Sequence, residues 1–345
     1  MKGKNTVKIA GVALASLMLA GGYAESYAQD GDRPVRRPLI EEYTGLWCGS
    51  CPRGLVALEL IDEQYGEDAV NISYHVDDQL TVTNVFPMNI SPGGITAVPT
   101  GSVNRVELLD PYYGKIEPVH FGIKEEIDKA IAQGSIAWID VDATLTGTNV
   151  QATTTVKFVD DLADNPYLVG YVLTSNGLTK SGWVQSNDYA GVKTIQGEPI
   201  EGTPLEELAQ WGPYQRGLTF NFTAIDVNGM KGVAGSLPAE IKAGEEYTHE
   251  FSYNISGNPL VQDPANLVVN VFLVDKVTGR VENANKYAFS SQEESGVGSV
   301  VTDAEVTAVA YYDLAGRRLV SPDHGIVIRV ETLSDGSSRT SKIVL

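Results

Sequence analysis

Apolar and polar residues alternate along the middle of the chain, which is typical of strands with one buried face. The alternation runs from residue 137 to 145 and again from 150 to 158, and the turn Gly147-Thr148-Asn149 between the two runs predicts a hairpin. Further strands are predicted at 167–174, 218–224, 247–255 and 267–275. Because no helical pattern separates these runs, we expect an all-β sandwich over residues 135–290.

The preceding region, residues 34–134, mixes the two periodicities and predicts an α/β domain. The expected order is a strand at 38–44, a helix through Leu55, Leu58, Ile61 and Tyr65 ended by Gly66, a strand at 69–76, an irregular stretch at 77–94, a strand at 101–109 and a helix at 117–133 ended by Gly134. The C-terminal part is set apart by a Ser/Gly-rich linker at 291–303. After it, residues 304–345 predict a small β unit with strands at 306–313, 325–330 and 340–344. The chain as a whole is therefore expected to be α+β and multidomain.

Residues 1–28 have the form of a signal peptide. Basic residues precede an apolar run from Ile9 to Ala20, and Ser26-Tyr27-Ala28 is a small-x-small cleavage signal that places the mature start at Gln29. The apolar run is short for a membrane helix, which needs about 20 residues. No cysteine lies at the cleavage point, which argues against a lipid anchor there. We expect an exported protein.

The chain is strongly acidic. Its net charge of −19 becomes −21 once residues 1–28, with three lysines and one glutamate, are removed. So large a negative charge repels nucleic acid and anionic lipid, so neither is expected as a partner. Solubility outside the cell is the simplest reason for the excess of acidic residues.

The only two cysteines, Cys48 and Cys51, lie in Trp47-Cys-Gly-Ser-Cys-Pro52 between a predicted strand and a predicted helix. A helix N-terminus stabilises a thiolate, which can attack a disulfide, and a second cysteine then resolves the mixed disulfide. We therefore expect Cys48 to cap the helix and to be the more exposed and more acidic thiol, with Cys51 resolving.

Three other uses of the pair fit less well. A disulfide that closes so short a loop contributes only about 2 kcal/mol, which makes it a poor structural staple. Zinc would need two further ligands, and the four histidines (His75, His120, His249 and His324) are scattered singly. Haem attachment would need a histidine where Pro52 stands. No cofactor or metal is expected.

Residues 34–134 resemble a thioredoxin-like domain, through the Trp-Cys-Gly-x-Cys motif, its strand–helix setting and the later Val98-Pro99. The resemblance implies that Pro99 is cis, lies beside the disulfide and helps to hold a substrate strand. It also implies that Glu42, where many thioredoxins have aspartate, is a buried carboxylate that helps to deprotonate Cys51. The alternative for Glu42 is an ordinary strand residue on a solvated face. One departure is that residues 77–94 lack the helix that thioredoxins place before the proline.

The wider motif from Glu41 to Gly54, with Thr44-Gly45 and Pro52-Arg53-Gly54, resembles the outer-membrane-protein-28-related family of Gram-negative envelope proteins. That resemblance covers about residues 36–290. It implies an exported thioredoxin-like domain followed by a β-sandwich, in the periplasm or at the outer-membrane surface. It does not imply a defined activity.

The last 40 or so residues resemble the C-terminal sorting domain of type IX secretion. The resemblance rests on Tyr312-Asp-Leu-x-Gly-Arg-Arg318, then Gly325-Ile-x-Ile, then a lysine near the end. It departs from that pattern at Val327, where an aromatic residue is usual, and at the terminal Leu345. It implies association with the outer membrane or the secretion machinery. The alternative is a small β unit packed on the sandwich.

Two function classes follow. One is an envelope thiol–disulfide oxidoreductase, with Cys48, Cys51, Glu42, Pro99 and Trp47 at its site, a thiol or disulfide substrate and, if it is a reductase, an envelope electron donor. The other is a surface binding or scaffold protein with a vestigial redox site. The aromatic residues of the long connection before residue 218 could line a binding surface or pack over the sandwich edge; they are Trp183, Tyr189, Trp211 and Tyr214.

Overall fold

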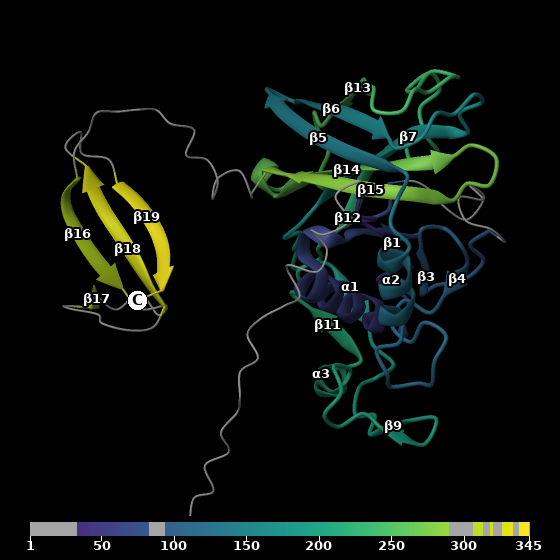
Figure 1. The fold of residues 1–345 in the computed structure, drawn as a ribbon. Coiled ribbons are helices and arrows are strands. Elements are labelled where there is room, and N and C mark those ends of the chain that lie inside the picture. The colour runs from purple at the N-terminus through teal and green to yellow at the C-terminus, as the bar shows by residue number, and fades with distance from the viewer. Residues whose placement is uncertain are drawn as a thin grey trace, which may run out of the picture. The chain divides into compact units, whose positions relative to one another are not determined.

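The computed structural model describes residues 33–82 and 94–289, together with four strands near the C-terminus at 306–312, 318–319, 326–333 and 338–344. The chain divides into two compact units, Met1–Phe289 and Ser290–Leu345 (Figure 1). The predicted signal peptide and linker lie outside the described residues. The described part contains no helix that is long and apolar enough to cross a membrane.

An eight-stranded sheet runs through the first unit in the order β15-β14-β7-β12-β2-β1-β3-β4. Strands β1 and β2 pair in parallel, and β12 joins them through a parallel contact of Thr223 with Ser73. The sheet therefore crosses the boundary expected at residue 134, and the two regions distinguished in the sequence share one sheet. Its strands are β1 (Leu39–Thr44), β2 (Val70–His75), β3 (Thr100–Val103), β4 (Leu108–Leu109), β7 (Tyr167–Ser175), β12 (Thr223–Gly229), β14 (Leu267–Asp275) and β15 (Val281–Ala288).

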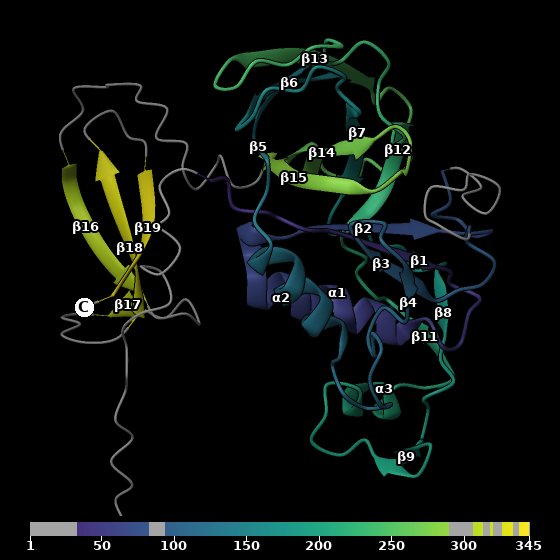
Figure 2. The same ribbon diagram turned by 45° about the vertical axis from the view of Figure 1, so that its right-hand side comes forward.

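The sheet curls so that β15 approaches the segments next to β1 and β3. Ala284 N donates to Arg37 O at 3.0 Å, and Val281 N donates to Asn104 O at 3.0 Å. Inside the curl lies an apolar core that includes Leu39, Tyr43, Ile72, Val172 and Phe272. Figures 1 and 2 show the helices on one side of the curled sheet and a three-stranded sheet on the other.

Two helices cover the β1–β3 end of the sheet. Helix α1 (Pro52–Tyr65) follows the cysteine motif and ends at Gly66, whose φ of 49° and N–H bond to Asp62 O close the last turn. Helix α2 (Ile123–Ala132) is shorter than the predicted 117–133. It begins late because Val119 has a φ of 68°, which lies outside the right-handed helical region.

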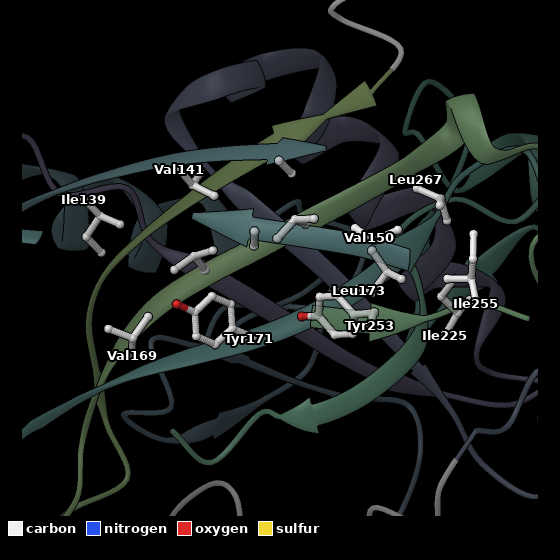
Figure 3. Packing of buried hydrophobic residues seen from close by; sticks show 14 of the residues in the cluster. Ile139, Val141, Val150, Val169, Tyr171, Leu173, Ile225, Tyr253, Ile255 and Leu267 are labelled. Atoms are coloured by element: carbon white, nitrogen blue, oxygen red, sulfur yellow. The ribbon is translucent and has the colours of Figure 1, made fainter. Parts of the chain in front are cut away.

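A second sheet, in the order β13-β6-β5, covers the β7–β14 end of the large sheet and completes the sandwich. Its strands are β5 (Ala137–Thr146), β6 (Asn149–Phe158) and β13 (Glu246–Asn254). The predicted hairpin is confirmed, with Thr146 paired to Asn149 at the turn. Inward residues of both sheets, among them Val141, Val150, Val169 and Tyr171, form one core (Figure 3). The mixed fold with a sandwich agrees with the expected fold class.

Two further predicted elements differ from the structure, and one strand of the structure was not predicted. The strand expected at 101–109 is two short strands, β3 and β4, because Asn104 and Arg105 both adopt φ of 54° and turn the chain back. The strand expected at 218–224 begins only at Thr223. Strand β15 was not predicted.

The connection between β7 and β12 also carries short elements that the sequence did not indicate. They are β8 (Val184–Ser186), β9 (Thr194–Ile195), β10 (Glu198–Pro199), α3 (Glu206–Gln210) and β11 (Tyr214–Arg216).

A buried ion pair lies at the β1–β3 end of the shared sheet, and its arginine also reaches the other region. Arg105 donates from Nη2 and Nε to the two oxygens of Glu41 at 2.7 and 2.8 Å, and from Nη1 to Met230 O at 2.9 Å. Its guanidinium also lies 4.9 Å from the ring centre of Phe272. Both charged side chains are almost fully buried, so removing either one would leave an uncompensated charge in the interior.

The second unit holds a four-stranded sheet in the order β17-β16-β18-β19. Its strands are β16 (Val306–Tyr312), β17 (Arg318–Leu319), β18 (Ile326–Leu333) and β19 (Ser338–Val344). The three strands predicted here are present, at slightly different bounds. The geometry by itself fits a sorting domain or another small β unit.

Candidate functional site

Cys48 and Cys51 form a disulfide at the start of α1, with their Cα atoms 5.4 Å apart. Cys51, not Cys48, is the N-cap residue; Cys48 lies one turn earlier, where its carbonyl accepts from Cys51 N at 3.3 Å. The prediction that Cys48 caps the helix is therefore wrong, because the N-cap position is one turn later in the chain. Cys48 is nevertheless the more exposed of the two, at 5% against 0% for Cys51.

Val98-Pro99 is cis, as expected, and reaches the disulfide: Cys48 Sγ lies 3.6 Å from Val98 O. Trp47 lies beside it with 53% of its surface exposed, while its Nε1 donates to Val76 O at 2.8 Å. The structure thus brings the cysteines, Trp47 and the Val98-Pro99 bond together. The indole is held at its nitrogen edge, and about half of the Trp47 surface stays exposed directly before Cys48 in the chain.

Glu42 is fully buried on β1, which excludes the solvated-face alternative. Its Oε2 accepts from Ser73 Oγ at 3.1 Å, and its Oε1 has no hydrogen-bond partner in the described part of the chain. Burial is the largest cause that raises the pKa of Glu42 from 4.5 to about 7; the nearby Arg53 guanidinium opposes the shift. Since a Cβ on Gly54 would overlap Oε1, the carboxylate lies directly beneath the first turn of α1. A carboxyl group there can take up or release a proton near neutral pH.

Arg53 fixes the cysteine loop from the other side. Its Nη1 donates to Ser50 O at 2.9 Å, between the two cysteines, and to Tyr189 Oη at 3.1 Å. Its Nη2 pairs with Asp110 Oδ2 at 2.6 Å, so the positive charge next to the motif is neutralised locally. The motif Pro52-Arg53-Gly54 thus has a physical use: Arg53 orients the loop and Gly54 makes room for Glu42.

A buried pair holds the entry to the motif. His75 Nδ1 lies 2.8 Å from Asp78 Oδ2, and the same oxygen accepts from Leu46 N at 2.8 Å. Burial alone would raise the pKa of Asp78, but the bonds from His75 and from backbone N–H groups lower it below its usual value. Asp78 is therefore an anion that positions the chain just before Trp47. Among the described residues, no group of three or more His, Cys, Asp and Glu side chains lies close enough together to hold a metal ion.

Residues 184–189, which sequence reasoning missed, line one side of the disulfide loop. Ser186 N donates to Leu46 O and Asp188 N donates to Gly49 O, each at 2.8 Å. Gln185 Nε2 adds bonds to the carbonyls of Cys48, at 3.0 Å, and Gly45, at 3.3 Å. No sequence motif indicates the contact between this segment and the cysteine loop, because it joins residues about 140 positions apart.

The aromatic residues of the same connection behave differently from one another. Trp183 and Tyr189 are buried, at 6% and 7% exposed, and Trp211 is half-buried, whereas Tyr214 is 71% exposed. Trp211 lines a groove of about 620 Å³ between α1 and residues 204–222. Its walls are mainly apolar, with Leu55, Leu218 and Phe222 among them.

No protein-family model matches the chain, and no curated protein matches it. Among solved structures, the chain is similar to HBP35 of Porphyromonas gingivalis, with a TM-score of 0.50 and 17% identity over 90% of this chain and 99% of that one. A protein of Agrobacterium tumefaciens from a structural genomics programme is similar at a TM-score of 0.43 and 15% identity, over 74% of this chain and 96% of that one. At these identities the likeness to HBP35 shows a shared fold.

Proposed function

We propose that the protein is an exported thiol–disulfide oxidoreductase that acts through Cys48 and Cys51. One observation carries the proposal: the disulfide opens α1, and Glu42, a buried carboxyl group with a pKa of about 7, lies against Gly54 in the first turn of the same helix. A structural disulfide has no need of a proton acceptor in the protein interior. A redox pair does, because the resolving thiol must lose a proton in each cycle.

In the reducing direction, the Cys48 thiolate attacks one sulfur of a substrate disulfide. The substrate S–S bond breaks, a mixed disulfide forms and the first substrate sulfur leaves as a thiolate. Cys51 gives its proton to Glu42 and attacks the Cys48 sulfur, which restores the Cys48–Cys51 disulfide and releases the second substrate sulfur. Two electrons pass from the protein to the substrate, and a dithiol donor of the envelope returns them. The oxidising direction is the reverse sequence.

The other residues of the site have supporting roles in this proposal. Trp47 and the Val98-Pro99 segment offer the surface on which a substrate strand lies beside Cys48. The signal peptide and the resemblance to the outer-membrane-protein-28-related family support a location in the periplasm or at the outer-membrane surface of a Gram-negative cell. The β unit at 304–345 supports sorting to that surface, in association with the outer membrane or the secretion machinery.

Turnover of an insulin disulfide coupled to a thiol reductant tests the proposal. The mature protein should reduce insulin, Cys48→Ser should abolish turnover, and Cys51→Ser should accumulate mixed disulfide. Glu42→Gln should slow resolution about a hundredfold or more, in the range usual for losing a proton-transfer group. Glu198→Gln, which changes an exposed carboxylate on β10, is the control. Absence of turnover in both directions, with insulin and with a reduced substrate protein, would falsify the proposal.

A second candidate function is binding without turnover, and the groove beside Trp211 favours it. Its volume is within the ~300–1,000 Å³ usual for ligand sites, and its walls are mainly apolar. If the Cys48→Ser, Cys51→Ser protein keeps its function in a cell-based assay while Trp211→Ala loses it, binding is the function and the redox pair is vestigial.

A further inference from the structure

Asp188 places a negative charge against the residue that follows Cys48. Its backbone N–H donates to Gly49 O at 2.8 Å, and a Cβ on Gly49 would overlap its carboxylate. Gly49 lies between the two cysteines, so the carboxylate is next to the disulfide loop. A larger side chain at residue 49 would push the Asp188 carboxylate away from the loop.

The position of this charge is fixed by its neighbours. Asn187 is 3% exposed and donates from Nδ2 to Leu208 O at 2.8 Å. Tyr189 is 7% exposed and accepts from Arg53. With both neighbours anchored, the exposed Asp188 side chain cannot move far from Gly49.

No cation balances Asp188 in the part of the chain that the structure describes. It forms no salt bridge, and the nearby guanidinium of Arg53 is neutralised by Asp110. Among the described residues, Val98 contacts Cys48 Sγ through its carbonyl and Trp47 precedes Cys48 in the chain, and neither side chain carries a charge. A substrate that brings a sulfur to Cys48 therefore meets the Asp188 carboxylate beside the disulfide loop, on a protein of net charge −19.

We infer that Asp188 is a specificity-determining residue, and that the site prefers disulfides flanked by basic residues over those flanked by acidic ones. The inference rests on the proposed function and adds its substrate class: cationic peptide disulfides, with the anionic glutathione disulfide as a poor substrate. The chemistry is the two-step exchange described above, with electrons supplied by a dithiol donor. The charge acts on the encounter, before the first sulfur–sulfur bond forms.

Three matched peptide disulfides test it, identical except for lysine, serine or glutamate on both sides of the cysteine. The reduced protein is mixed with each, and the second-order rate constant for release of peptide thiol is measured. At low ionic strength the lysine peptide should react about tenfold faster than the glutamate peptide, and salt should shrink the ratio. Asp188→Asn should lower the ratio about threefold, as expected for loss of one nearby charge, and Asp188→Lys should lower it further. Glu198→Gln removes the same charge from a distant point of the same connection and should leave the ratio unchanged.

The outcomes separate the two proposals. Equal rates for the lysine and glutamate peptides in the unmodified protein overturn the inference while leaving oxidoreductase function intact. An equal effect of Asp188→Asn and Glu198→Gln also overturns it, since net charge and not position would then set the preference. If even the serine peptide fails to react, the oxidoreductase proposal itself fails and the inference falls with it.

Discussion

The carboxylate of Glu42 occupies the space that a side chain at Gly54 would need. A glycine inside a helix costs about 1 kcal/mol relative to alanine. Here it allows a strand carboxyl group to lie directly beneath the first turn of α1, the helix that Cys51 caps. A buried carboxyl group at residue 42 thus requires a residue without a side chain at position 54.

Gly54→Ala should destabilise the protein by about 1–3 kcal/mol, because the overlap with Glu42 outweighs the gain in helix propensity. Urea unfolding of the oxidised protein measures the change. In a Glu42→Ala background the space is free, so the same substitution should be neutral or stabilising by up to about 1 kcal/mol. A loss of equal size in both backgrounds would show that Glu42 is not the obstacle.

Glu42→Gln should stabilise the oxidised protein at alkaline pH. The pKa of Glu42 is raised in the folded state from 4.5 to about 7, so folding favours the protonated form. Its contribution to stability is complete below pH 4.5 and is lost as the pH rises through 7. The variant should therefore be up to about 3 kcal/mol more stable than the unmodified protein at pH 8, and about equally stable at pH 4. Free energies of unfolding at the two pH values test this; an unchanging difference contradicts it.

Breaking the Glu41–Arg105 pair should cost about 3–5 kcal/mol, because either partner alone is a buried, unpaired charge. Arg105→Met and Glu41→Leu made together should recover much of that loss. The exposed Lys124–Asp128 pair serves as a control, since Lys124→Met should cost less than about 1 kcal/mol. If the double variant is no more stable than Arg105→Met alone, the ion pair does not account for the loss of stability.

Truncation after Phe289 should leave the melting temperature of the first unit nearly unchanged, because the chain divides into compact units at that point. If residues 304–345 direct sorting, the truncated protein should accumulate in the periplasm. Cell fractionation and surface labelling measure its location. Normal arrival at the surface would exclude the sorting role, and a large fall in melting temperature would make the β unit part of the structural core.

Local patterns predicted the elements whose cause is local. The alternation of apolar and polar residues specifies the β5–β6 hairpin, because successive side chains in each strand point alternately to the core and to solvent. The strand–Cys-x-x-Cys–helix order and the cis Val98-Pro99 bond were also predictable, through a resemblance carried by a few residues. Glu42 remained ambiguous in the sequence, because only the packing of Gly54 and Ser73 around it shows that it is buried.

Features that depend on distant parts of the chain could not be predicted. The parallel contact of β12 with β2 joins residues that no periodicity relates. Ser186 and Asp188 bind the cysteine loop through backbone N–H groups, which almost every residue has. The late start of α2 follows from the positive φ of Val119, which the helical spacing does not reveal.

The contact between residue 73 and residue 223 also sets an order of events when the chain is made. The ribosome releases the cysteine motif early, but β2 has no partner on its second edge until β12 has emerged. A nascent chain that ends before residue 223 therefore displays an unpaired strand edge and uncovered apolar faces, which are features that attract chaperones and promote aggregation. Because this pairing is so distant in sequence, its closure is expected to be slow. The thiol pair is thus synthesised long before the strands that surround it are complete.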